Sequence, residues 1–412
     1  MGEANKGTTS HISKIIDGNV NFGIKIPKRY LVSIAAVLVM KTLVAIIVYY
    51  LLNLGVVGSY WMDQTRVFSG PQNLILWQNP YHASSGEYLF LGWDSAWYLS
   101  IIAKGYSFSP QSIAFFPGLP SISGILNLAL ANPVSSLLIV TLLSGVAWVP
   151  LFQAISEHYM EKRLALVSTL IFALSPFTLL FSTVAYAEGL FLLLSLGSWW
   201  LCLKGRFGSA TIVATVSATT RPVGLLLALP IFLKALKTKR IKHISEKLYI
   251  LAAPGLGYLS AWVNGWLVTG NLYAIIMVNE WGTMYSFFTF ITRLLPVYLL
   301  GSFSMITQYL TINPLLPYFI MLFLILTPIT IIYFIRIDKE LAIYSLTYYI
   351  GILVFGAILS IPRYFSFLFP LWLTPSISRA FSGKRILIPY LILSVAITII
   401  LWLSFLNGVF VG

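Results

Sequence analysis

An all-helical protein that crosses a membrane many times is predicted from the composition and from the spacing of the apolar runs. Of the 412 residues, 58% are hydrophobic and 9% are charged, whereas soluble domains carry about 25% charged residues. The mean hydropathy is +0.87. Apolar runs of about 20 residues recur, and this is the length of a helix that crosses a bilayer core about 30 Å thick. The short alternating segments of a membrane barrel are not seen in the sequence.

The charges are predicted to sort to one side of the membrane. The net charge is +14, and Lys and Arg gather in the cytoplasmic loops of helical membrane proteins, so the excess does not indicate binding to nucleic acid. Residues 1–29 are polar and basic and are predicted to form a cytoplasmic leader. The first apolar run, about 30–57, is interpreted as a retained signal anchor. Its Lys41 is expected to snorkel or to face the bundle.

Residues 30–412 are predicted to form a single transmembrane domain of about 11 helical spans. Two of these spans are placed at residues 164–181 and 365–377. Residues 58–134 and 270–312 become long external segments in this topology, and the C-terminus lies outside.

The first external segment is predicted to contain helices that lie in the membrane interface. At the start of residues 94–105 and within them, Trp93, Trp97 and Ile101 recur every four residues. Trp and Tyr favour the headgroup level of a bilayer. This pattern therefore predicts a short helix lying flat at the membrane surface.

Several polar residues are predicted to meet at the external face. Asp94 lies in the first external segment, Glu188 and Arg221 lie at the ends of later spans, and Arg363 and Tyr364 lie near the end of the chain. An ionisable residue at membrane depth is costly and is a functional candidate by default. In this interpretation Asp94 takes a proton from an acceptor hydroxyl, and the arginines bind a phosphate leaving group. An aromatic surround would raise the pKa of Asp94 from its ordinary value of about 4.

Each of these residues also has a structural interpretation. Asp94 could cap its helix, Glu188 could be a buried partner of Arg221, and Arg363 could be an interface residue. Lys104 is also a candidate, although the favoured interpretation is a charge that faces solvent or headgroups. The candidates for binding the donor phosphate or the substrate, besides the two arginines, are Glu188, Tyr364, Trp93, Tyr98 and Lys104. Four further residues are predicted to form the architecture of the site: Phe115, Phe116, Pro117 and Pro120.

Several motifs are missing from the sequence. It has no phosphate-binding loop, no Asp-x-Asp pair, and no His or Cys cluster with metal-ligand spacing. The single cysteine, Cys202, lies in a predicted span, so no disulfide framework is expected. A nucleotide-activated donor and a metal site are therefore not expected, and a lipid-borne phosphate donor fits better.

Three patches of the sequence around the candidate residues resemble motifs of the phosphatidylinositol-glycan class V family, which comprises GPI mannosyltransferase 2 and its prokaryotic relatives. The strongest patch spans residues 93–120, and two further patches follow it. The matching residues are Trp93-Asp94, Tyr98, Ile102-Ala103, Gly105-Tyr106 and residues 114–120, then Ser175-Pro176 with Tyr186-Ala187-Glu188, then Arg221-Pro222-Val223-Gly224.

The resemblance implies a GT-C-type helical bundle that takes a sugar from a dolichyl- or polyprenyl-phosphate donor on the non-cytoplasmic side, with no cofactor and no required metal. Asp94 matches the acidic residue expected to act as general base, and inversion of a β-linked donor would yield an α-mannoside. Ala187 stands where Ser is expected in eukaryotic members, and Pro222-Val223 replace an expected Ser-Asn. These departures leave the acceptor open among a GPI precursor, another glycolipid, a lipid-linked oligosaccharide and a protein glycan.

The predicted function is that of a membrane mannosyl- or hexosyltransferase with a glycolipid or lipid-linked acceptor. Its expected partners are membrane lipids, the donor and the acceptor, and a small membrane subunit is left open. The expected location is the plasma membrane in a prokaryote or the endoplasmic reticulum membrane in a eukaryote. Two alternatives remain: a transporter or flippase of lipid-linked glycans, and a noncatalytic subunit of a glycosylation complex.

Overall fold

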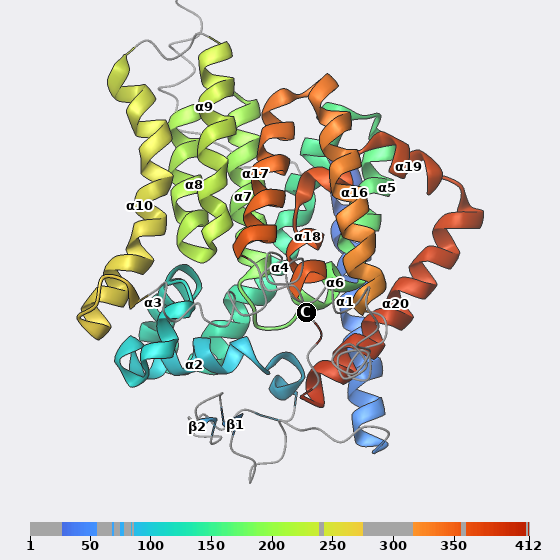
Figure 1. The fold of residues 1–412 in the computed structure, drawn as a ribbon. Coiled ribbons are helices and arrows are strands. Elements are labelled where there is room, and N and C mark those ends of the chain that lie inside the picture. Colours follow the sequence, from blue (N-terminus) through green and yellow to red (C-terminus); the bar gives the residue numbers. More distant parts are fainter. Residues whose placement is uncertain are drawn as a thin grey trace, which may run out of the picture.

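The computed structural model describes residues 27–55, 68–69, 75–77, 84, 86–238, 243–274, 316–355, 360–408 and 411. Within these residues the chain forms a bundle of helices, and two short helices lie across its lower end in Figure 1. The predicted all-helical class of fold is confirmed, apart from one small strand pair. Most of the predicted external segment at 270–312 lies outside the described residues.

The helices and strands follow one another in a simple order. Their bounds are α1 (Lys28–Asn53), β1 (Phe68–Ser69), β2 (Ile75–Trp77), η2 (Glu87–Phe90), α2 (Asp94–Lys104), η3 (Tyr106–Phe108), η4 (Pro110–Ala114), α3 (Gly118–Leu130), α4 (Pro133–Tyr159), α5 (Lys162–Ala173), α6 (Pro176–Phe181), α7 (Glu188–Leu203), α8 (Phe207–Thr220), η5 (Pro222–Leu227), α9 (Ala228–Lys237), α10 (Ile244–Thr269), α16 (Leu316–Ile337), α17 (Lys339–Phe355), α18 (Ile361–Ser366), η8 (Phe369–Leu373), α19 (Pro375–Ala380) and α20 (Lys384–Leu406). The two strands pair antiparallel.

Four helices in the described part of the chain are long and apolar enough to cross a membrane. They are α1, α4, residues Tyr318–Ile337 of α16, and α20. Large apolar side chains cover their outer faces, as Val39 on α1 and Ile392 on α20 illustrate. These helices make the chain an integral membrane protein, while the total of about 11 spans stays a prediction.

Basic residues collect at the end of the bundle opposite α2 and α3. The connections α4–α5, α7–α8 and α16–α17 lie at the upper end in Figure 1. Basic residues occupy these connections and the neighbouring helix ends: Lys162, Arg163, Lys204, Arg206, Lys237, Arg336, Lys339, Lys384 and Arg385. The positive-inside rule associates such a distribution with the cytoplasmic side.

Two predicted spans are not continuous helices. Residues 164–181 form α5 and α6, which are separated at Ser175-Pro176, and residues 365–377 fall across α18, η8 and α19. Prolines stand at the first turn of α6, α18, η8 and α19. Proline has no N–H to donate and clashes with the preceding turn, so it starts helices and interrupts them. Each of these two predicted spans therefore consists of short helical pieces, and whether the chain crosses the membrane there stays a prediction.

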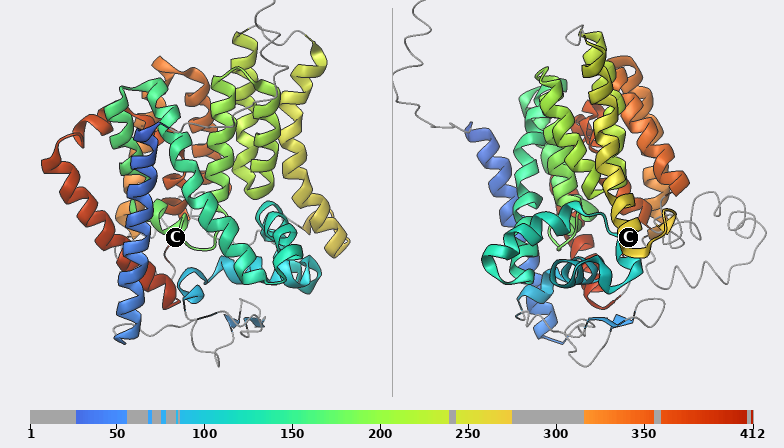
Figure 2. Two further views of the ribbon diagram at one scale, coloured as in Figure 1. Left: turned by 180° about the vertical axis from the view of Figure 1, so that it is seen from behind. Right: turned by 90° about the vertical axis from the view of Figure 1, so that its left-hand side faces the viewer.

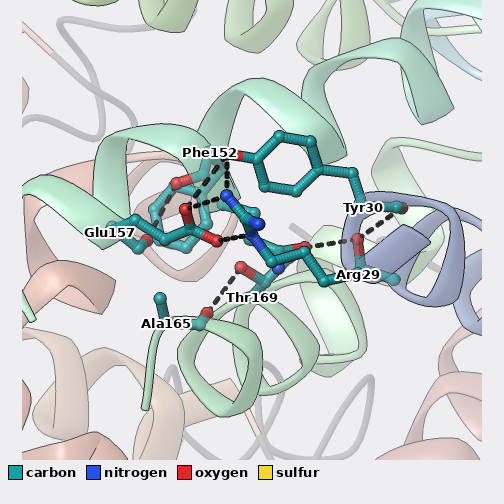
Figure 3. A network of polar contacts seen from close by, with 9 residues as sticks. Arg29, Tyr30, Phe152, Glu157, Ala165 and Thr169 are labelled. Atoms are coloured by element: carbon teal, nitrogen blue, oxygen red, sulfur yellow. Dashed lines mark hydrogen bonds and ion pairs between the residues drawn. The ribbon is translucent and has the colours of Figure 1, made fainter. Parts of the chain in front are cut away.

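The first helix is fixed against α4 along the bundle, as Figures 1 and 2 show. Near its start, Arg29 donates from Nε to Glu157 Oε1 at 2.6 Å and from Nη2 to Glu157 Oε2 at 2.9 Å. The hydroxyl of Tyr30 donates to the same carboxylate at 3.1 Å (Figure 3). This fork-like pairing anchors α1 at the end of the bundle that carries the basic residues.

Candidate functional site

Asp94 is the first residue of α2 and follows a tight turn. The N–H of Ser95 donates to the carbonyl of Gly92 at 3.0 Å. Between them Trp93 has φ 48° and ψ −113°, a conformation that normally requires glycine at the first central position of a turn. Strain of this kind costs about 1–3 kcal/mol and tends to occur at functional sites. The turn therefore identifies the start of α2 as a candidate site.

The carboxylate of Asp94 is not a helix cap. The residue that caps α2 is Trp93, and no side chain provides a capping hydrogen bond. Instead, Arg363 donates from Nη2 to Asp94 Oδ2 at 3.0 Å. Arg363 comes from α18, which lies 269 residues away in sequence, so tertiary structure rather than local helix chemistry sets the direction of this carboxylate.

Four charged residues join into one chain of ion pairs, which we call the charge cluster: Asp94, Arg363, Glu188 and Arg221. Arg363 pairs with Asp94 and, through Nε, with Glu188 Oε1 at 2.7 Å. Arg221 pairs with the same oxygen of Glu188. The four side chains come from the starts of α2 and α7, from α18, and from the residue that ends α8.

The members of the charge cluster differ in their access to solvent. The side chain of Asp94 is 28% exposed, those of Arg221 and Arg363 are 14% and 11% exposed, and that of Glu188 is 1% exposed. Two negative and two positive charges balance one another, which is what burial of ionised groups requires. Asp94 is therefore the open end of the cluster, and Glu188 lies beneath both arginines. The structural interpretation of Glu188 as a buried partner of Arg221 agrees with this geometry.

Aromatic rings hold the guanidinium group of Arg363 in place. Its central carbon lies 5.3 Å from the ring centroid of Phe181, 5.1 Å from that of Tyr186 and 5.5 Å from that of Tyr364. The guanidinium of Arg221 lies 5.1 Å from the ring of Tyr364. Cations are attracted to the faces of aromatic rings, more strongly where water is excluded. The predicted residues Arg221, Arg363 and Tyr364 are thus brought together.

Sequence reasoning missed Phe181 and Tyr186 as site residues. The N–H of Asp94 donates to the hydroxyl oxygen of Tyr186 at 3.2 Å, so this tyrosine contacts both Asp94 and Arg363. The available signal was its place two residues before Glu188, in a motif that the sequence analysis had already selected. Phe181 carried no such signal, because phenylalanine is common in membrane helices.

Burial changes the acid–base behaviour of Asp94. Loss of solvent raises the pKa of Asp94 above its ordinary value of 3.8, and the nearby Glu188 carboxylate acts in the same direction. The positive charges of Arg363 and Arg221 oppose this rise and do not cancel it. A carboxylate with a raised pKa is a stronger base when it is ionised.

The other two predicted residues of α2, Tyr98 and Lys104, differ in burial. Tyr98 is buried, and its ring meets that of Phe115 edge-on at 5.4 Å. Phe115 also stacks on Trp97 at 5.2 Å. Lys104 is exposed at the C-terminal end of α2, and no ion pair recorded in the described part of the chain includes it. The geometry therefore favours a solvent-facing role for Lys104.

The turn at residues 115–120 packs against α2, α10 and the end of α8. The ring of Phe116 lies 5.8 Å from that of Tyr258 in α10. Pro117 precedes α3 and Pro120 is buried in its first turn. Between these prolines, a Cβ added to Gly118 would lie 2.6 Å from Thr220 Cγ2. Since Arg221 follows Thr220 directly, this turn supports the backbone that presents Arg221.

We expect Gly118→Ala to reduce both stability and turnover. The added methyl group would also lie 2.8 Å from the backbone nitrogen of Thr220, so α3 or the end of α8 must move, and overpacking of this kind costs about 1–3 kcal/mol. Thermal unfolding and initial rates measure the two effects. The matched control is Gly124→Ala in the same helix, where no atom lies within 4 Å of the added group. Equal effects of the two substitutions would contradict the close contact.

Within the described residues, no group of three or more His, Cys, Asp or Glu side chains could hold a metal ion. The polar groups that the structure brings together are the carboxylates and guanidiniums of the charge cluster. Such a set can accept a proton and bind an anion.

The bundle and the charge cluster define a polytopic membrane protein with a polar site at one end. The family model described as Mannosyltransferase (PIG-V) matches residues 34–250, just over half of the chain. The chain belongs to this family, and the resemblance noted from its motifs is confirmed. Family membership supports a membrane glycosyltransferase. Asp94, Glu188 and Arg221 lie inside the matched region, whereas Arg363 lies outside it.

Two solved structures of the Archaeoglobus fulgidus oligosaccharyltransferase are similar to the chain. The crystal structure of the complex with Zn and sulfate has a TM-score of 0.42 and 12% identity and covers 90% of this chain. The crystal structure tethered through a disulfide bond to an acceptor peptide with the NVT sequon has a TM-score of 0.40 and 13% identity, again over 90% of this chain. The chain spans about half the length of these proteins, 53% and 55%. No curated protein matches the chain in sequence.

Proposed function

We propose that this protein transfers a mannosyl or related hexosyl group from a dolichyl- or polyprenyl-phosphate sugar to a hydroxyl of a glycolipid or lipid-linked acceptor. The observation that carries the proposal is the pair formed by Asp94 and Arg363 at the open end of the charge cluster, with 3.0 Å between Oδ2 and Nη2. A carboxylate that can accept a proton thus lies beside a guanidinium that can bind a phosphate.

Donor binding is proposed to release Asp94 from its partner. A guanidinium forms two parallel hydrogen bonds with a phosphate, and this geometry competes with a single bond to a carboxylate. A phosphate that reaches Arg363 would displace Asp94 Oδ2, while Glu188 would keep both arginines in place from below. The freed carboxylate would then face the acceptor with a pKa raised further by the bound anion.

The chemical step needs one proton acceptor and one stabilised leaving group. The acceptor hydroxyl gives its proton to Asp94, and its oxygen forms a bond to the anomeric carbon of the sugar. The bond between that carbon and the phosphate oxygen breaks, and its electron pair leaves with the lipid phosphate, whose charge Arg363 and Arg221 stabilise. Attack opposite the leaving group inverts the anomeric centre, so a β-linked donor yields an α-linked product. Asp94 then loses its proton to the departing phosphate or to solvent.

The site is proposed to face the non-cytoplasmic side of the membrane. The support for this is the collection of basic residues at the opposite end of the bundle. The membrane would be the plasma membrane of a prokaryote or the endoplasmic reticulum of a eukaryote. Neither a nucleotide, nor a metal, nor a cofactor takes part in the proposed reaction.

The choice of donor tests this function. The full chain in lipid nanodiscs is given a polar lipid extract from cells that lack the gene, together with radiolabelled polyprenyl-phosphate mannose or a radiolabelled nucleotide-activated mannose. We expect label in a lipid product from the polyprenyl-phosphate donor alone, at a rate that the Asp94→Asn variant lowers at least about 100-fold. Transfer from the nucleotide-activated sugar, or no covalent product from either donor, would contradict the proposal.

A further inference from the structure

A second polar group lies inside the bundle, apart from the charge cluster. Lys41 is near the middle of α1 and its side chain is 7% exposed. Its ammonium group donates to the carbonyl oxygen of Gly145 at 2.9 Å, to the carbonyl oxygen of Ser182 at 2.6 Å and to the hydroxyl oxygen of Ser182 at 2.8 Å. An ammonium group has three N–H donors, so these three acceptors match its full capacity.

This geometry excludes a snorkelling lysine. A snorkelling side chain carries its charge out to the interface, whereas the nitrogen of Lys41 ends on α4 and on the residue that follows α6. Lys41 stands 13 residues after Lys28, the first residue of α1, which corresponds to roughly 20 Å of helix. A charged residue at such depth is costly and is therefore a functional candidate.

The two acceptor segments lead to the charge cluster. Ser182 is the C-terminal cap of α6, where unpaired carbonyl groups attract cations. Phe181 lies directly before Ser182, and the chain then runs through Tyr186 to Glu188. The ring faces of Phe181 and Tyr186 contact the guanidinium of Arg363. Lys41 thus holds the segment that supplies three residues around Arg363.

The second acceptor connects Lys41 to the start of α7. A Cβ added to Gly145 would overlap the carbonyl oxygen of Ser182, so α4 and the end of α6 approach as closely as backbones can. A Cβ added to Gly189, the residue after Glu188, would lie 3.0 Å from the Cα of Gly145. The ammonium group of Lys41 therefore connects α1 to the close contact between the backbones of α4 and the end of α6. The start of α7, which contains Glu188, packs against the same part of α4.

We propose that Lys41 is a positioning residue for sugar transfer: it holds residues 182–188 so that Tyr186 and Glu188 keep Arg363 in line with Asp94. This inference rests on the proposed function. Lys41 touches neither Asp94 nor Arg363 among its recorded hydrogen bonds, so it acts through the backbone of the segment. A displacement of about 1 Å at a reacting group can slow a reaction by about 100-fold.

The test is Lys41→Met in the full chain in nanodiscs, assayed with polyprenyl-phosphate mannose. Methionine keeps an unbranched, buried side chain and removes all three donors. We expect kcat to fall about 10- to 100-fold, with a KM for the donor that changes less than about threefold. The matched control is Lys28→Met at the exposed start of the same helix, which should leave both constants unchanged. Wild-type turnover in Lys41→Met would overturn the inference, as would a loss confined to KM.

A milder variant keeps the inference testable if Lys41→Met does not fold. Ser182→Ala removes only the hydroxyl acceptor at 2.8 Å and should lower kcat severalfold at constant KM. Where Lys41→Met does fold, the loss in the double variant should be smaller than the product of the two single losses, because both substitutions act through one contact. Multiplying losses, or an unchanged kcat in Ser182→Ala, would contradict the inference. If Asp94→Asn keeps the wild-type turnover, the proposed function itself fails, which is a separate outcome.

Discussion

Asp94→Asn is expected to lower kcat by about 100- to 10,000-fold, the range that a general base usually contributes. Asparagine keeps the shape of the side chain and still offers an oxygen to Nη2 of Arg363, but it cannot take a proton from an acceptor hydroxyl. Glu188 continues to pair with both arginines, so the bundle should fold. Initial rates of lipid-product formation in nanodiscs measure the effect.

The pH dependence of the rate provides the second reading of this variant. Burial raises the pKa of Asp94 above 3.8, and only the ionised carboxylate can accept a proton. The rate of the wild-type protein should therefore rise with pH through that raised pKa and then level off, and the residual rate of Asp94→Asn should lack this rise. The control is Glu87→Gln in η2, just before α2, where the carboxylate accepts hydrogen bonds from Ser84 instead. An unaltered pH profile in Asp94→Asn would contradict the role of Asp94 as the proton acceptor.

Glu188→Gln is expected to destabilise the fold more than any other single change in the charge cluster. Glu188 is 1% exposed and pairs with both Arg221 and Arg363. Glutamine would remove the buried negative charge that the two guanidiniums share. Removing one partner from a buried pair costs about 3–5 kcal/mol. Unfolding in increasing denaturant measures this loss, and turnover should fall as well because Arg363 loses its support.

Glu157→Gln is the matched control for this stability effect. Glu157 also accepts two hydrogen bonds from an arginine, but that arginine, Arg29, is 39% exposed and can recover water when the pair is broken. The loss should therefore be clearly smaller than that of Glu188→Gln, and turnover should not change. Equal losses in the two variants would show that burial of the cluster does not determine its contribution.

Local patterns predicted the parts of the site that depend on a single segment. The short helix at residues 94–105 was expected from its aromatic spacing, and α2 begins at Asp94 as predicted. The breaks within residues 164–181 and 365–377 were not expected, because their hydropathy is continuous and a proline in an apolar run can be tolerated in a membrane helix. Only the structure located these two breaks.

Contacts between distant segments could not be predicted in the same way. Arg363 was expected near the external face, but its two partners lie 269 and 175 residues away in sequence. The acceptors of Lys41 could not be predicted either, since they are mainly backbone carbonyl groups, which every residue possesses. Side-chain identities thus indicated which groups needed partners, and the fold decided which partners they found.

The bonding of Lys41 also has a consequence for how the protein is made. Its acceptors lie 104 and 141 residues further along the chain, so they do not yet exist when the ribosome delivers α1 to the insertion machinery. A lysine at the centre of an inserting helix costs about 2.5–3.5 kcal/mol, and the strongly apolar remainder of α1 must offset that cost alone. Helix α1 therefore reaches its final position only after α4 and α6 have been synthesised, so its packing is completed late in the assembly of the bundle.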